Sequence, residues 1–269
     1  DRTAGTTARV SVGLASAQGN GDSTWPAMSL DGRYVVFTSL ASNLVANDKG
    51  FPQDIFLRDV SGETTVKVAG GNSTSYQPAI SGDGRYVAFT SLASNLVVGD
   101  TNGKLDAFLF DRNTTTTERL SVASDGTQGN GPCYMPSVSD DGQRVAFDSA
   151  ATNLVPGDTN GVRDVFVRDR AQGQTLRVSL SDGGAQADGN SFHASLTRAG
   201  DRVAFSSEAT NLKAGDTNGV RDIFWREVGS GTTRVSVADD ESQATGGASL
   251  NPAISEDGLK VVFSSTATN

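Results

Sequence analysis

Short runs rich in Val, Ile, Phe and Thr alternate with Gly, Asp and Asn along the whole chain, in an order that recurs several times. The first unit has such runs at 26–29, 34–37, 54–57 and 64–68, with a polar loop between the second and third. Apolar runs divided by turn-forming residues are typical of strands. No window of ten or more residues carries apolar side chains at the helical spacing i, i+3, i+4 and i+7. The pattern therefore predicts an all-β protein built from four-stranded antiparallel units.

The unit recurs at a nearly fixed interval. A phenylalanine in the second run of each unit marks the repeat, with spacings of 52, 58, 58 and 58 residues: Phe37, Phe89, Phe147, Phe205 and Phe263. Four-strand repeats of this length are typical of β-propellers. We therefore expect one β-propeller domain over residues 1–269, with about five four-stranded blades.

The two ends of the sequence hold incomplete units. Residues 1–12 match residues 111–122 as the end of a unit, and residues 252–269 contain only the first two strands of one. Propellers commonly close by pairing strands from both termini in one blade, so these segments are expected to share the fifth blade. That blade would lack a loop and a third strand. The alternative is that the chain is part of a larger propeller.

One phrase of the repeat resembles a known signature. Residues 78–91, Pro-Ala-Ile-Ser-Gly-Asp-Gly-Arg-Tyr-Val-Ala-Phe-Thr-Ser, are similar to the Pro-x-x-Ser-x-Asp-Gly-(Arg/Lys)-x-(Ile/Val)-Ala-Phe-x-Ser pattern of TolB-like propeller repeats, the bacterial WD-like blades. Residues 136–149 and 252–265 repeat it, and the fourth copy departs from it at Ala194 and Ala199. The resemblance implies a propeller that serves as a protein-binding scaffold, a peptidase module or a polysaccharide-degrading enzyme. The fold does not choose among these.

Charge and composition narrow the choice of partners. The formal net charge is -9, which disfavours nucleic acid and anionic membranes because phosphate groups need a positive face. No apolar run approaches the roughly 18 residues of a membrane span, so no membrane insertion is expected. Abundant Ser, Thr, Asn and Gly with little Lys suits an exported bacterial protein. We therefore expect a secreted, periplasmic or cell-surface location, and either a monomer or a part of a larger chain.

A polar loop after the second strand of each unit carries oxygen-bearing side chains at regular positions. Ca²⁺ takes six to eight oxygen ligands at about 2.3 to 2.6 Å, and closely spaced Asp and Asn in a tight turn can supply them. The first unit has Gly50 where the others have Asn, so its site should be the weakest. The other interpretation is that these residues only cap a hairpin turn. The candidate calcium ligands are Asp48, Asp54, Asp100, Asn102, Asp106, Asp158, Asn160, Asp164, Asp216, Asn218 and Asp222.

A second recurrent phrase follows the fourth strand of most units. It begins with Gln in each case, at Gln18, Gln128, Gln186 and Gln243. Successive strands of an antiparallel sheet reverse direction, so the loops after the second and fourth strands open at the same end of a blade. Both recurrent phrases are therefore expected on one face of the propeller.

An aromatic residue lies near the start of the first strand in four units, at Trp25, Tyr76, Tyr134 and Phe192, the last followed by His193. We expect these residues at the loop face or the mouth of the central channel, where aromatic rings could stack on sugar rings or anchor a peptide. Packing between blades is the other interpretation of the same residues.

The sequence as a whole favours a non-enzymatic extracytoplasmic binding or scaffold module. Its partner would be a protein, a peptide or a glycan, and its loops would hold several Ca²⁺ ions. No residue is assigned a catalytic role. The alternative is a carbohydrate-active enzyme, a polysaccharide lyase or a glycoside hydrolase, in which His193, the only histidine, acts as the base.

Overall fold

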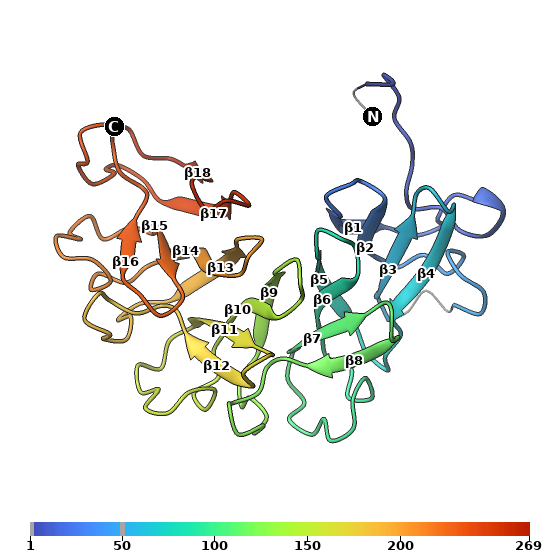
Figure 1. Cartoon of the computed structure of the whole chain (residues 1–269), viewed down its shortest axis with the longest axis horizontal. Coiled ribbons are helices and arrows are strands. Elements are labelled where there is room, and N and C mark those ends of the chain that lie inside the picture. Colours follow the sequence, from blue (N-terminus) through green and yellow to red (C-terminus); the bar gives the residue numbers. More distant parts are fainter. Residues whose placement is uncertain (1–2, 49–51) are drawn as a thin grey trace.

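A computed structural model describes residues 3–48 and 52–269. The strands form four sheets of four antiparallel strands and one sheet of two, which we number blades 1 to 5 in chain order. Figure 1 shows the blades set radially around an arc, with the first strand of each nearest the centre. The helical content of the described residues is a single 3-10 turn, η1 (Leu14–Ser16). The predicted all-β propeller architecture is confirmed.

The strand boundaries follow the repeat closely. Blade 1 consists of β1 (Ser23–Met28), β2 (Tyr34–Ser39), β3 (Asp54–Asp59) and β4 (Thr64–Ala69). Blade 2 consists of β5 (Ser75–Ile80), β6 (Tyr86–Ser91), β7 (Asp106–Asp111) and β8 (Thr116–Arg119). Blade 3 consists of β9 (Cys133–Val138), β10 (Arg144–Ser149), β11 (Asp164–Asp169) and β12 (Gln174–Arg177). Blade 4 consists of β13 (Ser191–Leu196), β14 (Arg202–Ser207), β15 (Asp222–Glu227) and β16 (Thr232–Arg234), and blade 5 of β17 (Ser249–Ile254) and β18 (Val261–Ser265).

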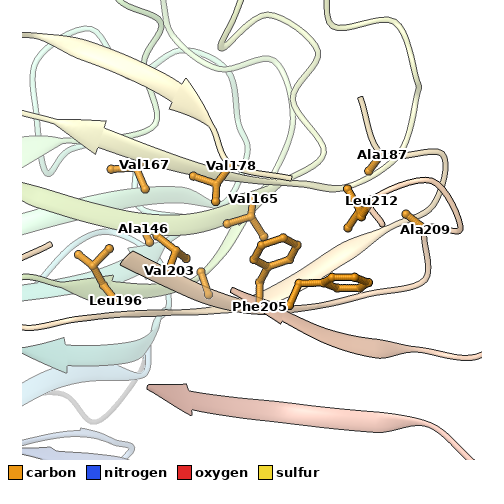
Figure 2. Packing of buried hydrophobic residues seen from close by; sticks show 12 residues of the cluster. Ala146, Val165, Val167, Val178, Ala187, Leu196, Val203, Phe205, Ala209 and Leu212 are labelled. Atoms are coloured by element: carbon orange, nitrogen blue, oxygen red, sulfur yellow. The ribbon is translucent and has the colours of Figure 1, made fainter. Parts of the chain in front are cut away.

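The core lies between neighbouring blades. A blade with neighbours on both faces needs no alternation of apolar and polar residues, which is why the second and third strands are buried almost throughout. Figure 2 shows the seam between blades 3 and 4, where Ala146 and Val165 face Val203 and Phe205. Burying a side chain such as Phe205 stabilises the fold by about 1.5 to 3 kcal/mol.

A glycine in the turn before the second strand allows close contact with the preceding blade. Gly84 has a φ of +73°, and a Cβ placed on it would lie 2.2 Å from Cδ2 of Tyr34 in blade 1. A Cβ on Gly142 would meet the ring of Tyr86 in the same way, at 2.4 Å. The Asp-Gly pair of the repeat thus provides both a left-handed turn and the close approach that the seam requires.

Within residues 3–48 and 52–269, the N-terminal and C-terminal segments do not share a blade. β17 and β18 make a sheet of two strands, and no sheet among the described residues joins them to the N-terminal segment. That segment packs on blade 1 instead: Thr65 Oγ1 donates to the Val12 carbonyl at 2.7 Å, as Thr175 Oγ1 donates to the Val122 carbonyl at 2.6 Å. Residues near Val12 therefore do occupy the position of a unit end, as expected. The sheets form an open arc with the N and C ends on its two arms (Figure 1), and a larger propeller stays a prediction.

Candidate functional site

The first strands of all five blades line one hollow at the inner edge of the arc, with a volume of about 600 Å³. We call it the inner hollow and define it by one residue from each blade: Trp25, Gln77, Met135, His193 and Asn251. Its volume falls within the range of about 300 to 1,000 Å³ that is typical of ligand pockets.

These five residues occupy the same position of a repeated β-bulge. In blade 1, Thr24 pairs with Thr38 and Ala27 with Val36, so that Trp25 and the residue after it oppose a single residue of β2. The five bulge residues have φ values of 52°, 53°, 48°, 55° and 52°. A residue other than glycine in this left-handed region costs roughly 1 to 2 kcal/mol. Bulges re-aim side chains, and here they bring five side chains to one hollow.

Side chains of one blade brace the bulge of the next. The Met135 amide donates to Oε1 of Gln77 at 3.0 Å, and Thr90 Oγ1 also donates to this oxygen at 3.3 Å. One seam further on, the His193 amide donates to Oδ1 of Asp148 at 3.1 Å. The backbone of the inner hollow is therefore held by hydrogen bonds that cross the seams.

Asp148 departs from the repeat. The other blades carry a hydroxyl at this position: Thr38, Thr90, Ser206 and Ser264. The Asp148 side chain is fully buried, and its Oδ2 lies 3.2 Å from Nη1 of Arg163. Burial raises the pKa of Asp148 to about 7, although Arg163 and the His193 amide lower it.

His193 is held in its neutral form. Burial lowers the pKa of the imidazole, and the nearby guanidinium groups of Arg221 and Arg163 lower it further. The lowered pKa favours the uncharged imidazole at neutral pH. Among the described residues, no Asp, Glu, Lys or Arg lines the inner hollow.

Only two of the predicted ligand-binding residues line the inner hollow, namely Trp25 and His193. Tyr76, Tyr134 and Phe192 lie one position before the bulge, so they are not equivalent to Trp25. The rings of Tyr134 and Phe192 pack under Arg163, whose Cζ lies 4.1 and 5.2 Å from their centroids. Packing at a seam is the interpretation that these two residues support.

Gln77, Met135 and Asn251 are not among the ligand-binding residues that the sequence predicts. They differ in chemistry, so a search for a shared side-chain type could not find them. The signal that marks them is the Pro of the repeat, which directly follows Trp25, Gln77, Met135 and Asn251. Alignment on this Pro gives the bulge series directly.

The predicted calcium loops hold a basic side chain of the protein itself. In blade 3, Nη2 of Arg177 lies 3.1 Å from Oδ1 of Asp158, and its Nη1 lies 3.7 Å from Oδ2 of Asp164. Asn160 turns its amide nitrogen to Oδ2 of Asp164 at 2.9 Å, and the Ser179 hydroxyl donates to the other oxygen. Arg119 in blade 2 and Arg234 in blade 4 lie between the aspartates of their own loops in the same way.

Blade 1 has the same arrangement with lysine. Nζ of Lys67 lies 3.1 Å from Oδ1 of Asp48 and 2.5 Å from Oδ2 of Asp54. Gly50, which marks this loop as the weakest predicted site, lies outside the described residues.

These contacts bear on whether the loops fit Ca²⁺. Asn102, Asn160 and Asn218 each present a nitrogen rather than an oxygen to the second Asp of the loop. Within the described ranges, no group of three or more His, Cys, Asp or Glu side chains is placed to hold a metal ion. Burial raises the pKa of Asp54, Asp106, Asp158, Asp164 and Asp216, and the basic neighbour of each opposes that rise. The donor atoms as arranged do not fit a calcium shell, and calcium binding stays a prediction.

The two recurrent loop phrases do meet, as expected. Nε2 of Gln128 donates to Oδ1 of Asp100 at 3.0 Å, and Nε2 of Gln243 donates to Oδ1 of Asp216 at 2.7 Å. In blade 3, Gln186 donates instead to the Gly157 carbonyl at 2.7 Å. The loops after the second and fourth strands therefore share one face.

No protein-family model matches the sequence, and no curated protein matches it. Solved structures do resemble the fold. TolB from Acinetobacter baumannii has 20% identity and a TM-score of 0.54, over 94% of this chain and 53% of that one, so this chain spans about half of its length. A protein from Agrobacterium tumefaciens assigned as a TolB has 19% identity and a TM-score of 0.59, over 93% of this chain and 72% of that one.

A propeller from an enzyme is equally similar. The β-propeller domain of the Trilobed protease from Pyrococcus furiosus has 12% identity and a TM-score of 0.58, over 92% of this chain and 66% of that one. In the part of the chain that the structure describes, no helix has the length and apolar character needed to cross a membrane. The comparisons show that the chain has a TolB-like β-propeller fold.

Proposed function

We propose that this chain is a non-enzymatic binding module that takes a protein segment, a peptide or a glycan in the inner hollow. The observation that carries the proposal is the set of five positive-φ bulges that direct side chains into one space. Backbone strain of this kind persists where the surrounding structure over-determines it, and it clusters at binding sites. Glycine would adopt this φ without strain, yet all five positions carry a side chain.

The composition supports a site of action outside the bacterial cytoplasm, whether secreted, periplasmic or on the cell surface. The fold is compatible with binding because it is shared with TolB proteins, but it is also shared with a protease domain. The inner hollow, rather than the fold, therefore carries the proposal.

The test is a binding selection followed by a mapping of the site. A displayed library of random peptides and an array of immobilised glycans are each screened with the whole chain, and the tightest binder is measured by calorimetry. Trp25→Ala and Met135→Ala remove two walls of the inner hollow and should weaken that binder at least tenfold. Val98→Ala, at a fully exposed loop position, serves as the control. Binding that all three variants leave unchanged would place the ligand elsewhere.

A carbohydrate-active enzyme is the second candidate, and one observation favours it. The surroundings of His193 favour its neutral form, and its amide donates to Asp148, which pairs with Arg163. A neutral imidazole can accept a proton, as a lyase or hydrolase base must. Turnover of a polysaccharide panel that His193→Ala abolishes would establish the enzyme, and inactivity on all of them would support the binding module.

A further inference from the structure

We propose that the inner hollow binds an uncharged sugar, with a ring stacked on Trp25 and hydroxyl groups bonded by the side-chain amides of Gln77 and Asn251. This inference rests on the proposed function, because it names the class of ligand for the same hollow. It excludes the peptide and the acidic glycan that the proposed function leaves open.

Trp25 offers a free aromatic surface. The residue is 49% exposed although it lines a hollow, and among the described residues no aromatic ring or cation is found over its indole. Trp225, the other tryptophan, lies under the guanidinium of Arg202, with Cζ 5.1 Å from the ring. A large aromatic ring exposed in a pocket is suited to stack on the C–H face of a sugar.

Gln77 offers a fixed hydrogen-bond donor. Its Oε1 is occupied by the Met135 amide and the Thr90 hydroxyl, so its orientation is set and its Nε2 is the end left for a ligand. Asn251 is exposed at the equivalent position of blade 5, and its side-chain amide also hydrogen-bonds to His193. Side-chain amides both donate and accept hydrogen bonds, as the hydroxyl groups of a sugar do.

The lining has no charge to match a charged ligand. The chain carries a formal charge of -9, yet the hollow is lined by Trp, Gln, Met, Asn, Pro, Ser and Ala with a neutral His193. A carboxylated sugar or a basic peptide would enter without an ionic partner in the hollow. Interfaces match charge with charge, so the neutral lining favours a neutral ligand.

The inner edge of the blades is also a poor template for a peptide. An extended peptide would bind by adding a strand to the exposed edge of β1, β5, β9, β13 or β17. The bulge interrupts all five strands. All but β13, which has Ala194, also carry a Pro at the bulge: Pro26, Pro78, Pro136 and Pro252. Bulges and prolines protect strand edges from pairing. The ligand must therefore be recognised by side chains.

The experiment uses Trp25 as its own reporter. Trp225→Phe leaves it as the only tryptophan, and its fluorescence is titrated with maltohexaose, cellohexaose and chitohexaose, with hexagalacturonate as the anionic probe, and with the tightest peptide from the library. At least one uncharged hexasaccharide should give a saturable change. Gln77→Ala and Asn251→Ala should each weaken it at least tenfold, while the exposed Asn113→Ala should not.

Two other outcomes would contradict the proposal of an uncharged sugar. Saturation with hexagalacturonate or the peptide alone, with sensitivity to Gln77→Ala, would refute the uncharged sugar and leave the binding module standing. No saturation with any probe, together with a failed library and array screen, would refute both. The melting temperature of each variant shows whether a loss of binding reflects a loss of fold.

Discussion

Nη2 of Arg177 lies 3.1 Å from Oδ1 of Asp158, and both side chains are buried. The arginine therefore places a positive charge beside the carboxylates for which the sequence pattern predicted a metal ion. Removing one partner of a buried pair leaves the other charge uncompensated, which costs about 3 to 5 kcal/mol. We expect Arg177→Met to lower the free energy of unfolding by about 3 kcal/mol in urea titrations, for the same reason.

The matched control is Arg33→Met, which breaks the Arg33–Asp59 pair at 2.8 Å, where Arg33 is 47% exposed. Exposed pairs contribute little because water screens them. The loss should be much smaller than that of Arg177→Met. Equal losses in the two variants would show that the loop pair has no special role in stability.

Calcium gives a second prediction at the same loops. Since Arg119, Arg177, Arg234 and Lys67 already lie beside the loop carboxylates, we expect the melting temperature to be the same in EDTA and in excess Ca²⁺. A stabilisation of 1 kcal/mol would move it by about 2 to 4 °C in a protein of this size. A rise in melting temperature of several degrees on adding Ca²⁺, abolished by the double variant Asp164→Asn with Asp222→Asn, would establish calcium sites. It would contradict the conclusion that the basic side chains alone neutralise the loop carboxylates.

The glycines of the repeat allow a test of how the blades pack. Gly84 and Gly157 have nearly equal φ values of +73° and +72°, but a Cβ on Gly84 would strike Tyr34 whereas one on Gly157 would meet nothing within 4 Å. Both Ala variants bear the left-handed strain of roughly 1 to 2 kcal/mol. Only Gly84→Ala also forces the seam apart, so its free energy of unfolding should be lower by a further 1 to 3 kcal/mol, roughly the cost of overpacking. Equal destabilisation in urea would contradict the seam contact.

The sequence predicts the blades well because the repeat carries their signal five times. The spacing of Phe37, Phe89 and Phe147 sets the period. A Gly before each second strand, preceded by Asp in every blade but the fourth, is a local turn signal. The sequence leaves two arrangements of the ends open, a shared fifth blade and a larger propeller, and the described residues do not form the shared blade. Pairing of blade 5 with the N-terminal segment would be a contact between residues far apart in sequence, for which the repeat carries no local signal. The observed packing of Val12 on Thr65 is such a contact.

The site was predictable only in part. The sequence identifies Trp25 because an aromatic residue recurs near the start of the first strand in four units. Gln77 and Asn251 share a backbone conformation with Trp25 rather than a side-chain type. A positive φ at a residue other than glycine cannot be predicted from the type of that residue. The sequence also does not identify the basic side chain that lies beside the aspartates of each loop. Arg177 is on the fourth strand, 19 residues after Asp158 along the chain, so no local pattern links the two residues.

Asp148 should make stability depend on pH. Its pKa of about 7 in the folded chain lies above the value of about 3.9 expected when the chain is unfolded. Between these values the folded state holds a proton that the unfolded state has lost, so stability falls as pH rises, by at most about 1.4 kcal/mol per pH unit. Asn cannot titrate, and Asp148→Asn should gain stability relative to the wild type from about pH 4 to pH 7.

Urea unfolding across this range measures the effect. Asp125→Asn is the control, because backbone and side-chain hydrogen bonds from Thr127 lower the pKa of Asp125 and its titration falls below the range. A constant difference between Asp148→Asn and the wild type would mean that Asp148 is ionised throughout.

Trp25→Gly distinguishes a role of Trp25 in ligand binding from a role in the stability of the fold. Gly accepts a φ of 52° without strain, which offsets the loss of an indole that is 49% exposed, so the melting temperature should change little. The measurement that tests the account most directly is the affinity of this variant for the tightest binder from the peptide and glycan screens. The account predicts a dissociation constant at least tenfold above that of the wild type at an unchanged or higher melting temperature. An unchanged dissociation constant would contradict the assignment of the inner hollow as the binding site.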